Sequence, residues 1–231
     1  MSETTEGRRE NSYVPGMGHD RLLPFYDPLH RLLGMAKVHR PLVDQAYVQP
    51  GHRILEIGCG TGNLSILVKR LHPAADVVGL DPDPKALARA RRKAGRKELP
   101  VRLDRGFAQE LPYSDASFDR VLSAFMFHHL GPEEKERALR EVRRVLKPGG
   151  SLHLLDLERA KGSSSESLMA RLFHRTHAHH RNHLPRGNFG DRIPTLMREA
   201  GFPDPTEVDH RVKKGLGRVA YYRATVPVSF A

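Results

Sequence analysis

The 231-residue sequence has one cysteine, no tryptophan and few aromatic side chains, which make up 6% of the chain. A single cysteine, Cys59, excludes an internal disulfide, a zinc site built from several cysteines and redox chemistry by a cysteine pair. No stretch approaches the roughly 18 consecutive apolar residues of a membrane span. The first residues also lack the basic and then apolar pattern of a secretory signal. We therefore expect a cytoplasmic protein without a membrane span.

Positive charge is the strongest bias in the composition. Lysine and arginine number 38 against 27 aspartate and glutamate residues, which gives a formal net charge of +11. Such a balance invites a nucleic-acid partner. We interpret the cations that crowd the predicted helices at 84–94 and 133–146 as solvated faces, because so few aromatic residues leave little stacking surface for single-stranded RNA. A nucleic-acid partner is thus allowed by the sequence but not favoured.

The order of apolar segments after residue 50 predicts an α/β fold. Short apolar runs, expected to be strands, alternate there with amphipathic stretches, expected to be helices. The expected strands are 54–57, 77–80, 101–104, 118–124, 151–157, 207–212 and 217–226, and the expected helices are 63–71, 84–94 and 133–146. This alternation is typical of a Rossmann-like, seven-stranded, mostly parallel sheet with helices on both faces, which residues 51–231 would form.

Three segments fall outside the alternation. Residues 1–20 are polar without an apolar period and predict a flexible tail. Residues 21–50 predict an N-terminal helical cap of one or two helices, broken near Pro41. After the fifth strand, residues 161–190 begin with a Gly-Ser-Ser-Ser linker and predict a lid segment, which is followed by a short helix at 193–200.

A glycine-rich stretch stands where the first strand must turn into the first helix of the alternation. Gly58, Gly60 and Gly62 tolerate positive φ there and let a ligand approach the backbone. The spacing is G-x-G-x-G, so the dinucleotide pattern G-x-G-x-x-G fits poorly, and an NAD-linked oxidoreductase is disfavoured. Asp81 ends the second strand 19 residues after Gly62, close to the spacing of about 20 at which an acid meets a ribose. The alternative role of Asp81 is to cap the helix that follows Pro82.

These segments resemble, in order, the motifs of class I S-adenosylmethionine-dependent methyltransferases. The resemblance is to the subgroup with a methyltransferase type 11 domain that includes ubiquinone and menaquinone biosynthesis methyltransferases. It rests on Ile54 to Ser65, Val77 to Pro84, Leu111-Pro112-Tyr113 with Ser117-Phe118-Asp119, His128-His129-Leu130, and Leu146-Lys147-Pro148-Gly149-Gly150. It implies methyl transfer from S-adenosylmethionine to an O, N or C atom of a small-molecule acceptor, and a quinone-like compound or an aromatic natural product would suit this subgroup.

The resemblance also implies which residues bind the cofactor. Glu56 would anchor its methionine end, Asp81 would hold its ribose and Pro82 would pack against its adenine. The family's Gly-Asp-Ala-Glu stretch reads Gly-Phe-Ala-Gln here, without the acid, so Phe107 would offer only apolar packing and Ala108 a backbone contact. The full implied set is Glu56, Gly58, Gly60, Gly62, Asp81, Pro82, Phe107, Ala108 and Ser123.

Two residues are candidates for the transfer chemistry. His128 follows the fourth strand and could take a proton from the acceptor, although a histidine there could instead orient the loop. Tyr26 resembles a tyrosine of the family's lead-in helix and could cover the cationic sulfonium, although a core aromatic is the structural alternative. The five histidines between His174 and His183 have a spacing that permits metal ligation, but no nearby acid completes the set, so we expect no metal.

Two other functions stay open. The positive charge favours an RNA-modifying methyltransferase, whereas the run Ser123-Ala124-Phe125-Met126 stands where an Asn-Pro-Pro-Tyr-like run would be expected in an amino-directed nucleic-acid enzyme. A catalytically silent regulatory protein would bind S-adenosylmethionine and transfer nothing. The sequence leaves the acceptor and the oligomeric state open.

Overall fold

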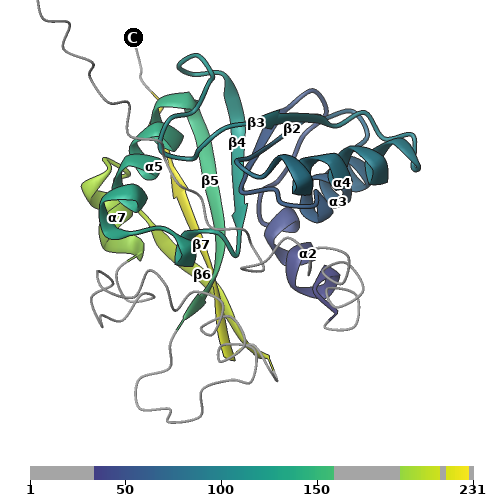
Figure 1. Cartoon of the computed structure of the whole chain (residues 1–231). Helices are drawn as coiled ribbons and strands as arrows, with labels where there is room; N and C mark the ends of the chain where they lie inside the picture. Colours follow the sequence, from purple (N-terminus) through teal and green to yellow (C-terminus); the bar gives the residue numbers. More distant parts are fainter. Residues whose placement is uncertain (1–33, 159–192, 214–216, 229–231) are drawn as a thin grey trace, which may run out of the picture.

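The computed structural model describes residues 34–158, 193–213 and 217–228 (Figure 1). The predicted tail at 1–20, the lid at 161–190, Tyr26 and the histidines from 174 to 183 lie outside the described residues. The N-terminal cap is described from residue 34 onward, and its division from the rest of the chain stays a prediction.

One sheet of seven strands forms the centre of the described molecule, in the order β3-β2-β1-β4-β5-β7-β6. The strands are β1 (Arg53–Ile57), β2 (Asp76–Asp81), β3 (Arg102–Arg105), β4 (Phe118–Ala124), β5 (Leu146–Glu158), β6 (Thr206–Lys213) and β7 (Gly217–Thr225). Strands β1 to β5 are parallel to one another, and β7 is antiparallel to both β5 and β6. The predicted fold class is confirmed. The chain crosses from β3 to β4 on the other side of β1, so the carboxyl ends of β1 and β4 flank a topological switch point, where such sheets bind ligands.

Helices cover both faces of this sheet, as the alternation predicts (Figure 1). They are α2 (Ala36–Asp44), α3 (Asn63–Leu71), α4 (Pro84–Gly95), α5 (Pro132–Val145) and α7 (Ile193–Glu199), with a 3₁₀ turn η2 at Phe127–His129. Apolar residues of α2 and α3 pack in one buried cluster on the sheet, and those of α5 and α7 pack in another. No helix in the described ranges is long and apolar enough to cross a membrane.

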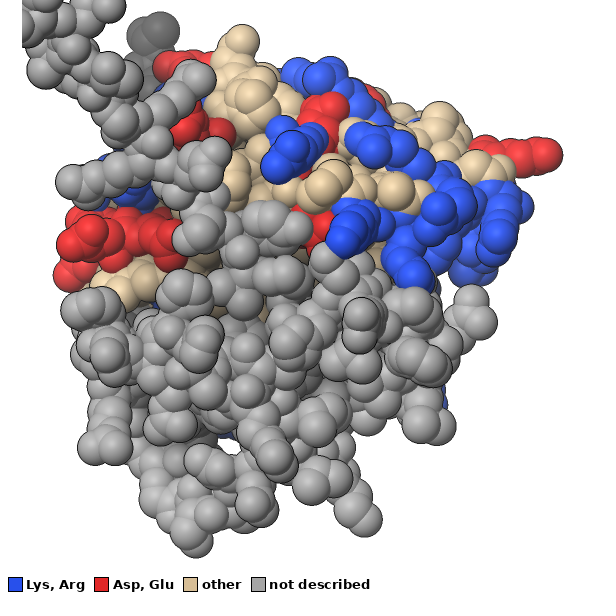
Figure 2. Space-filling view, viewed as in Figure 1, with Lys and Arg blue, Asp and Glu red and all other residues tan. Residues whose placement is uncertain are grey.

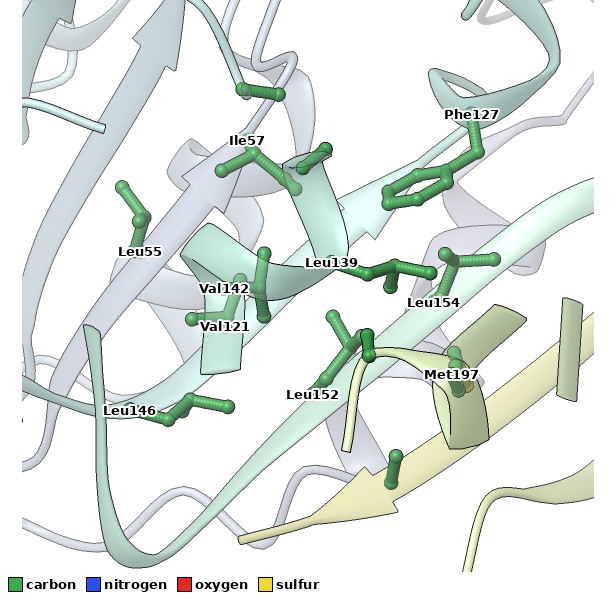
Figure 3. Packing of buried hydrophobic residues seen from close by; sticks show 14 of the residues in the cluster. Leu55, Ile57, Val121, Phe127, Leu139, Val142, Leu146, Leu152, Leu154 and Met197 are labelled. Atoms are coloured by element: carbon green, nitrogen blue, oxygen red, sulfur yellow. The ribbon is translucent and has the colours of Figure 1, made fainter. Parts of the chain in front are cut away.

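Helix α5 shows how the apolar pattern builds the larger cluster (Figure 3). Pro132 begins the helix with a fixed φ, and two glutamates in its first turn complement the positive end of the helix dipole. Leu139 and Val142 face the sheet and pack with Val121 of β4 and Leu152 of β5. Burial of this stripe, rather than the charged outer face, therefore holds α5 on the sheet.

Pro41 does not break the first described helix, so that prediction is wrong. Helix α2 runs through Pro41, and the N–H of Gln45 still donates to the Pro41 carbonyl at 3.0 Å. The proline removes one helical hydrogen bond. The helix persists because Val38, Leu42 and Val43 are buried in the cluster that α2 shares with the sheet.

The start of β5 also differs from the prediction. The sequence predicts a helix to Leu146 and a strand from Ser151, whereas α5 ends at Val145 and β5 begins at Leu146. Leu146 pairs with Phe118 and Ser151 with Arg120, so the strand bulges between these pairs. Gly149, with a φ of 77°, supplies the left-handed residue that this bulge needs.

Candidate cofactor and methyl-transfer site

The turn between β1 and α3 depends on three glycines with positive φ. Gly58, Gly60 and Gly62 have φ values of 70°, 50° and 75°. A Cβ atom on Gly58 would collide with the side chain of Met126, and one on Gly62 would lie 2.9 Å from the Cβ of Ala90. A Cβ on Gly60 would meet no atom within 4 Å. The outer glycines are thus required by packing, whereas the middle one faces open space.

Two residues at the end of β2 hold this turn in place. The carbonyl of Leu80 accepts a hydrogen bond from the N–H of Gly58 at 2.8 Å. The carboxylate of Asp81 accepts from the N–H of Gly60 at 2.7 Å and from the N–H of Asp83 at 2.9 Å. The acid that the sequence predicts for the ribose therefore lies directly beside the middle glycine of the turn.

Asp83, rather than Asp81, caps α4. One carboxylate oxygen of Asp83 accepts from the N–H groups of Lys85 at 2.8 Å and Ala86 at 3.2 Å. The alternative role that the sequence allowed for Asp81 is therefore filled by its neighbour. Burial raises the pKa of the Asp81 carboxyl to about 6, so most of it is ionised at pH 7 and accepts hydrogen bonds.

Glu56 lies behind the turn and holds the start of α3. Its side chain is buried, with the residue 3% exposed, and it accepts hydrogen bonds from the hydroxyl and the backbone N–H of Ser65. The N-cap of α3 is Gly62, which has no side chain to serve the first N–H groups, so Glu56 supplies a cap from the adjacent strand. Burial raises the pKa of Glu56 to about 8. Its contact with the methionine end of a cofactor stays a prediction.

The residues predicted to surround the adenine follow the ends of β2 and β3. The N–H of Gly106 donates to the carbonyl of Asp81 at 3.3 Å, which ties the segment after β3 to the end of β2. Pro82 and Phe107 are half-buried, and Ala108 is buried in the core. Phe107 stands where the family's stretch has its aspartate, and Gln109, which stands where that stretch has glutamate, donates to Glu134 of α5 at 3.3 Å. Gln109 therefore has a hydrogen-bond partner within the protein. The roles of Phe107 and Ala108 toward the cofactor stay predictions.

Ser123 lies at the carboxyl end of β4, between Ile57 of β1 and Leu154 of β5. The residue is 1% exposed, and its hydroxyl oxygen has no hydrogen-bond partner among the described residues. A buried polar atom without a partner costs about 1–3 kcal/mol. An orphaned hydroxyl at this edge, together with the open space at Gly60, fits a site made for a polar ligand.

His128 lies just beyond β4, in the turn η2. Its ring Nδ1 is 2.6 Å from Oδ1 of Asp156, and its backbone N–H donates to Oδ2 of the same carboxylate at 2.8 Å. The side chain of Asp156 is 2% exposed and that of His128 is 25% exposed. The sequence predicted the histidine but not its partner. The one available signal was an acid that interrupts the otherwise apolar end of the fifth strand.

The predicted residues that the structure describes gather at one edge of the sheet. The glycine turn, Asp81, Ser123 and His128 all stand at the carboxyl ends of β1, β2 and β4, which are adjacent strands. Tyr26 is outside the described residues, so its role as a cover for the sulfonium stays a prediction. In the part of the chain that is described, no three His, Cys, Asp or Glu side chains are grouped so as to hold a metal ion.

Comparison with known proteins places the similarity of this chain among methyltransferases. Residues 54–150 match the family model described as a methyltransferase domain. The demethylmenaquinone methyltransferase of Thermus thermophilus is 43% identical over 138 residues, which cover 58% of this chain and 62% of that protein. The demethylmenaquinone methyltransferase of Deinococcus radiodurans is 39% identical, with 58% of this chain and 56% of that protein covered. The chain therefore spans about three fifths of the length of these curated relatives.

A solved structure from Thermotoga maritima, described as an S-adenosylmethionine-dependent methyltransferase and possible histamine N-methyltransferase, is 25% identical with a TM-score of 0.64. The match covers 89% of this chain and 96% of that one. These comparisons confirm the resemblance of the sequence to S-adenosylmethionine-dependent methyltransferases.

Proposed function

We propose, because residues 54–150 match the model of a methyltransferase domain, that this protein transfers a methyl group from S-adenosylmethionine to a small-molecule acceptor. The observation that carries the proposal is the pairing of Gly60 with Asp81. A glycine that faces open space lies 2.7 Å, through its N–H, from a carboxylate at the end of the next strand. Such a turn lets a ligand lie close to the protein main chain, beside a group that accepts hydrogen bonds from a ribose.

Residues at the carboxyl ends of β1, β2 and β4 would each bind a different part of the cofactor. Asp81 would accept hydrogen bonds from the ribose hydroxyls, the turn at Gly60 would lie against the methionine end, and the hydroxyl of Ser123 would find its missing partner in the bound ligand. When bound, S-adenosylmethionine supplies an electrophilic methyl group on a sulfonium. The protein's own task is to align the acceptor and exclude water, which can lower the barrier by about 7–11 kcal/mol.

The names of the two relatives suggest the class of acceptor. Both are demethylmenaquinone methyltransferases, so we extend to this chain a quinone-like aromatic acceptor that is methylated at O or C. The single cysteine agrees with a reducing compartment, and we assign the reaction to the cytoplasm. A test is methyl transfer from cofactor labelled in its methyl group to a panel of hydroquinones, phenols and amines.

One surface favours the RNA alternative. Helix α4 and the residues after it carry no acid from 84 to 97, and Figure 2 shows Lys and Arg side chains gathered where α4 lies. Two of these cations, Arg92 and Lys93, stand in the last turn of α4, where they stabilise the negative end of the helix dipole, and Lys93 also donates to Asn63 at 2.7 Å. Labelled transfer to RNA, with binding that weakens steeply with salt, would replace the small-molecule proposal.

Replacing Asp81 by alanine is expected to abolish measurable cofactor binding. The change removes the ribose acceptor and also the hydrogen bond that holds the N–H of Gly60. Calorimetry with S-adenosylmethionine, its demethylated product and NAD checks this, and we expect the wild type to bind the first two and not NAD. Asp76→Ala is the matched control, because Asp76 is an exposed acid at the opposite end of the same strand. Binding of NAD alone would overturn the assignment of the cofactor.

Cofactor affinity is also expected to fall below pH 6. Burial raises the pKa of Asp81 to about 6, and only the ionised carboxylate accepts hydrogen bonds from both ribose hydroxyls. About one tenth of Asp81 is ionised at pH 5, so the dissociation constant should be about tenfold higher there than at pH 7.5. Calorimetry at the two pH values measures the change. Asp81→Asn should bind weakly at both, and an equal affinity of the wild type at both would contradict the ribose role.

A further inference from the structure

We infer that His128 and Asp156 work as one unit, in which Asp156 positions His128 to take a proton from an acidic hydroxyl of the acceptor, such as that of a phenol or hydroquinone. The inference rests on the proposed function and deepens it, because it names the class of acceptor and the residue that positions the base. Neither the sequence motifs nor the comparisons point to Asp156.

Asp156 is held more firmly than its contact with the ring alone would require. Its Oδ1 is 2.6 Å from Nδ1 of His128 and accepts the N–H of Leu157 at 2.8 Å, while its Oδ2 accepts the N–H of His128 at 2.8 Å. The carboxylate thus binds both the main chain and the ring of the same histidine, from a position that is nearly inaccessible to solvent. This double contact fixes the ring relative to the end of β4.

The contact also decides which ring nitrogen is basic. An ionised carboxylate only accepts hydrogen bonds, so Nδ1 of His128 carries the hydrogen and Nε2 keeps the lone pair. The ring of His129 lies with its centroid 4.0 Å from that of His128, which restricts rotation of the His128 ring. Once Nε2 takes a proton, the buried carboxylate stabilises the imidazolium that forms.

The unit stands at the edge where the cofactor would lie. Two residues before His128, the side chain of Met126 fills the space that the missing Cβ of Gly58 leaves. Five residues before it, Ser123 is the last but one residue of β4, and its hydroxyl has no hydrogen-bond partner among the described residues. The loop that carries the histidine is therefore packed directly on the glycine turn.

The need for a base selects the acceptor. The nitrogen of an uncharged aryl amine already has a lone pair and can lose its proton after methylation, whereas a phenolic hydroxyl has a pKa near 10 and is only about one part in a thousand ionised at pH 7. Nε2 of His128 takes the hydroxyl proton, and the electron pair left on the acceptor forms the new bond to the methyl carbon at the oxygen or at an adjacent ring carbon. In the second case the methylated ring carbon then loses its own hydrogen to water as a proton, which restores the aromatic ring. The sulfur keeps the electron pair of the bond that breaks, and His128 then gives its proton to water.

The first test reads the tautomer directly and needs no acceptor. Nitrogen NMR of ¹⁵N-histidine-labelled protein, with His128→Gln used to assign the signal, should show the hydrogen of neutral His128 on Nδ1. In Asp156→Asn the amide has one acceptor oxygen in place of two and carries no charge, so we expect the preference for the hydrogen on Nδ1 to weaken and part of it to move to Nε2. A wild-type ring with its hydrogen on Nε2 would overturn the inference.

The second test is kinetic. Asp156→Asn should lower kcat for a hydroquinone acceptor by at least about a hundredfold, while KM for the acceptor and the cofactor dissociation constant stay within about threefold. Asp156→Glu should recover part of kcat, and a thermal unfolding curve checks that each variant is folded. Asp209→Asn and His210→Gln make the same chemical changes on exposed residues of β6 and serve as controls.

The outcomes separate this inference from the proposed function. A folded Asp156→Asn protein that retains kcat would overturn the role of Asp156. A wild type that binds the cofactor and methylates only amines would leave the proposed function standing and remove the hydroxyl acceptor. A wild type that binds no cofactor in calorimetry would overturn the proposed function and this inference with it.

Discussion

The free energy of unfolding of the wild-type protein should fall as the pH rises from 6.5 to 8, and Glu56→Gln is expected to abolish most of that fall. Burial raises the pKa of Glu56 from 4.5 to about 8 in the folded protein. The folded state therefore holds a proton that the unfolded chain has already lost in this window. Stability falls with rising pH wherever the folded state binds more protons than the unfolded state. The titration of Glu56 should therefore lower the free energy of unfolding of the wild type by ~2 kcal/mol between pH 6.5 and 8.

Glutamine reproduces the protonated side chain and does not titrate. Its carbonyl oxygen still accepts from Ser65, and any loss of about 1 kcal/mol from the second hydrogen bond shifts the stability curve without changing its slope. Asp81 titrates mainly below the window, and His153, whose pKa is lowered by burial to about 3, is neutral throughout. The slope that the substitution removes therefore belongs to Glu56.

Urea unfolding at pH 6.5, 7.25 and 8 measures this difference between variant and wild type. Glu110→Gln is the matched control, because it makes the same chemical change at an exposed residue close to the site. Parallel pH profiles for Glu56→Gln and the wild type would show that Glu56 is ionised in the folded protein throughout the window. The cap that it gives to α3 would then be a carboxylate at neutral pH.

The periodicity of the sequence predicts most of the fold because buried strands and amphipathic helices each have a distinct pattern. Strand β4 and helix α3 have the predicted bounds, β1 differs by one residue at its start, and β2 and β3 differ by one residue at each end. The errors arise where tertiary contacts override a local signal. Pro41 is tolerated because its neighbours are buried. Residues 146–150 extend a strand because Leu146 pairs with Phe118 of β4, and because Gly149 and Gly150 form backbone hydrogen bonds with Val226, just after β7.

The candidate site was predictable only where its residues are close in sequence. The glycine turn forms one continuous motif, and Asp81 stands at a recognisable distance from it. Asp156 has no such signal, because it meets His128 only through the pairing of β4 with β5. The same limit applies to Glu56 and Ser65, which lie on successive elements and meet because α3 packs back over β1. Sequence spacing therefore predicts the residues around the glycine turn better than it predicts the contacts of His128.

Gly60→Ala should weaken cofactor binding about a hundredfold while leaving the protein folded. The added Cβ meets no protein atom within 4 Å, so its only structural cost is the left-handed φ of 50°, about 1–2 kcal/mol. The open space that receives this methyl group is the space we assign to the methionine end of the cofactor. An intruding methyl costs a packed interface about 1–3 kcal/mol, and a hundredfold loss corresponds to about 2.8 kcal/mol.

Gly51→Ala provides the control for this experiment. Gly51 has a φ of 79° and open space around its missing Cβ, but it precedes β1 and so lies at the opposite edge of the sheet. The two variants should therefore lose similar stability in urea, and only Gly60→Ala should lose affinity for S-adenosylmethionine in calorimetry. Equal affinities of the two variants would mean that the ligand does not lie against the middle of the turn. The two outer glycines cannot make this distinction, because a Cβ on either would strike Met126 or Ala90 and disturb the fold itself.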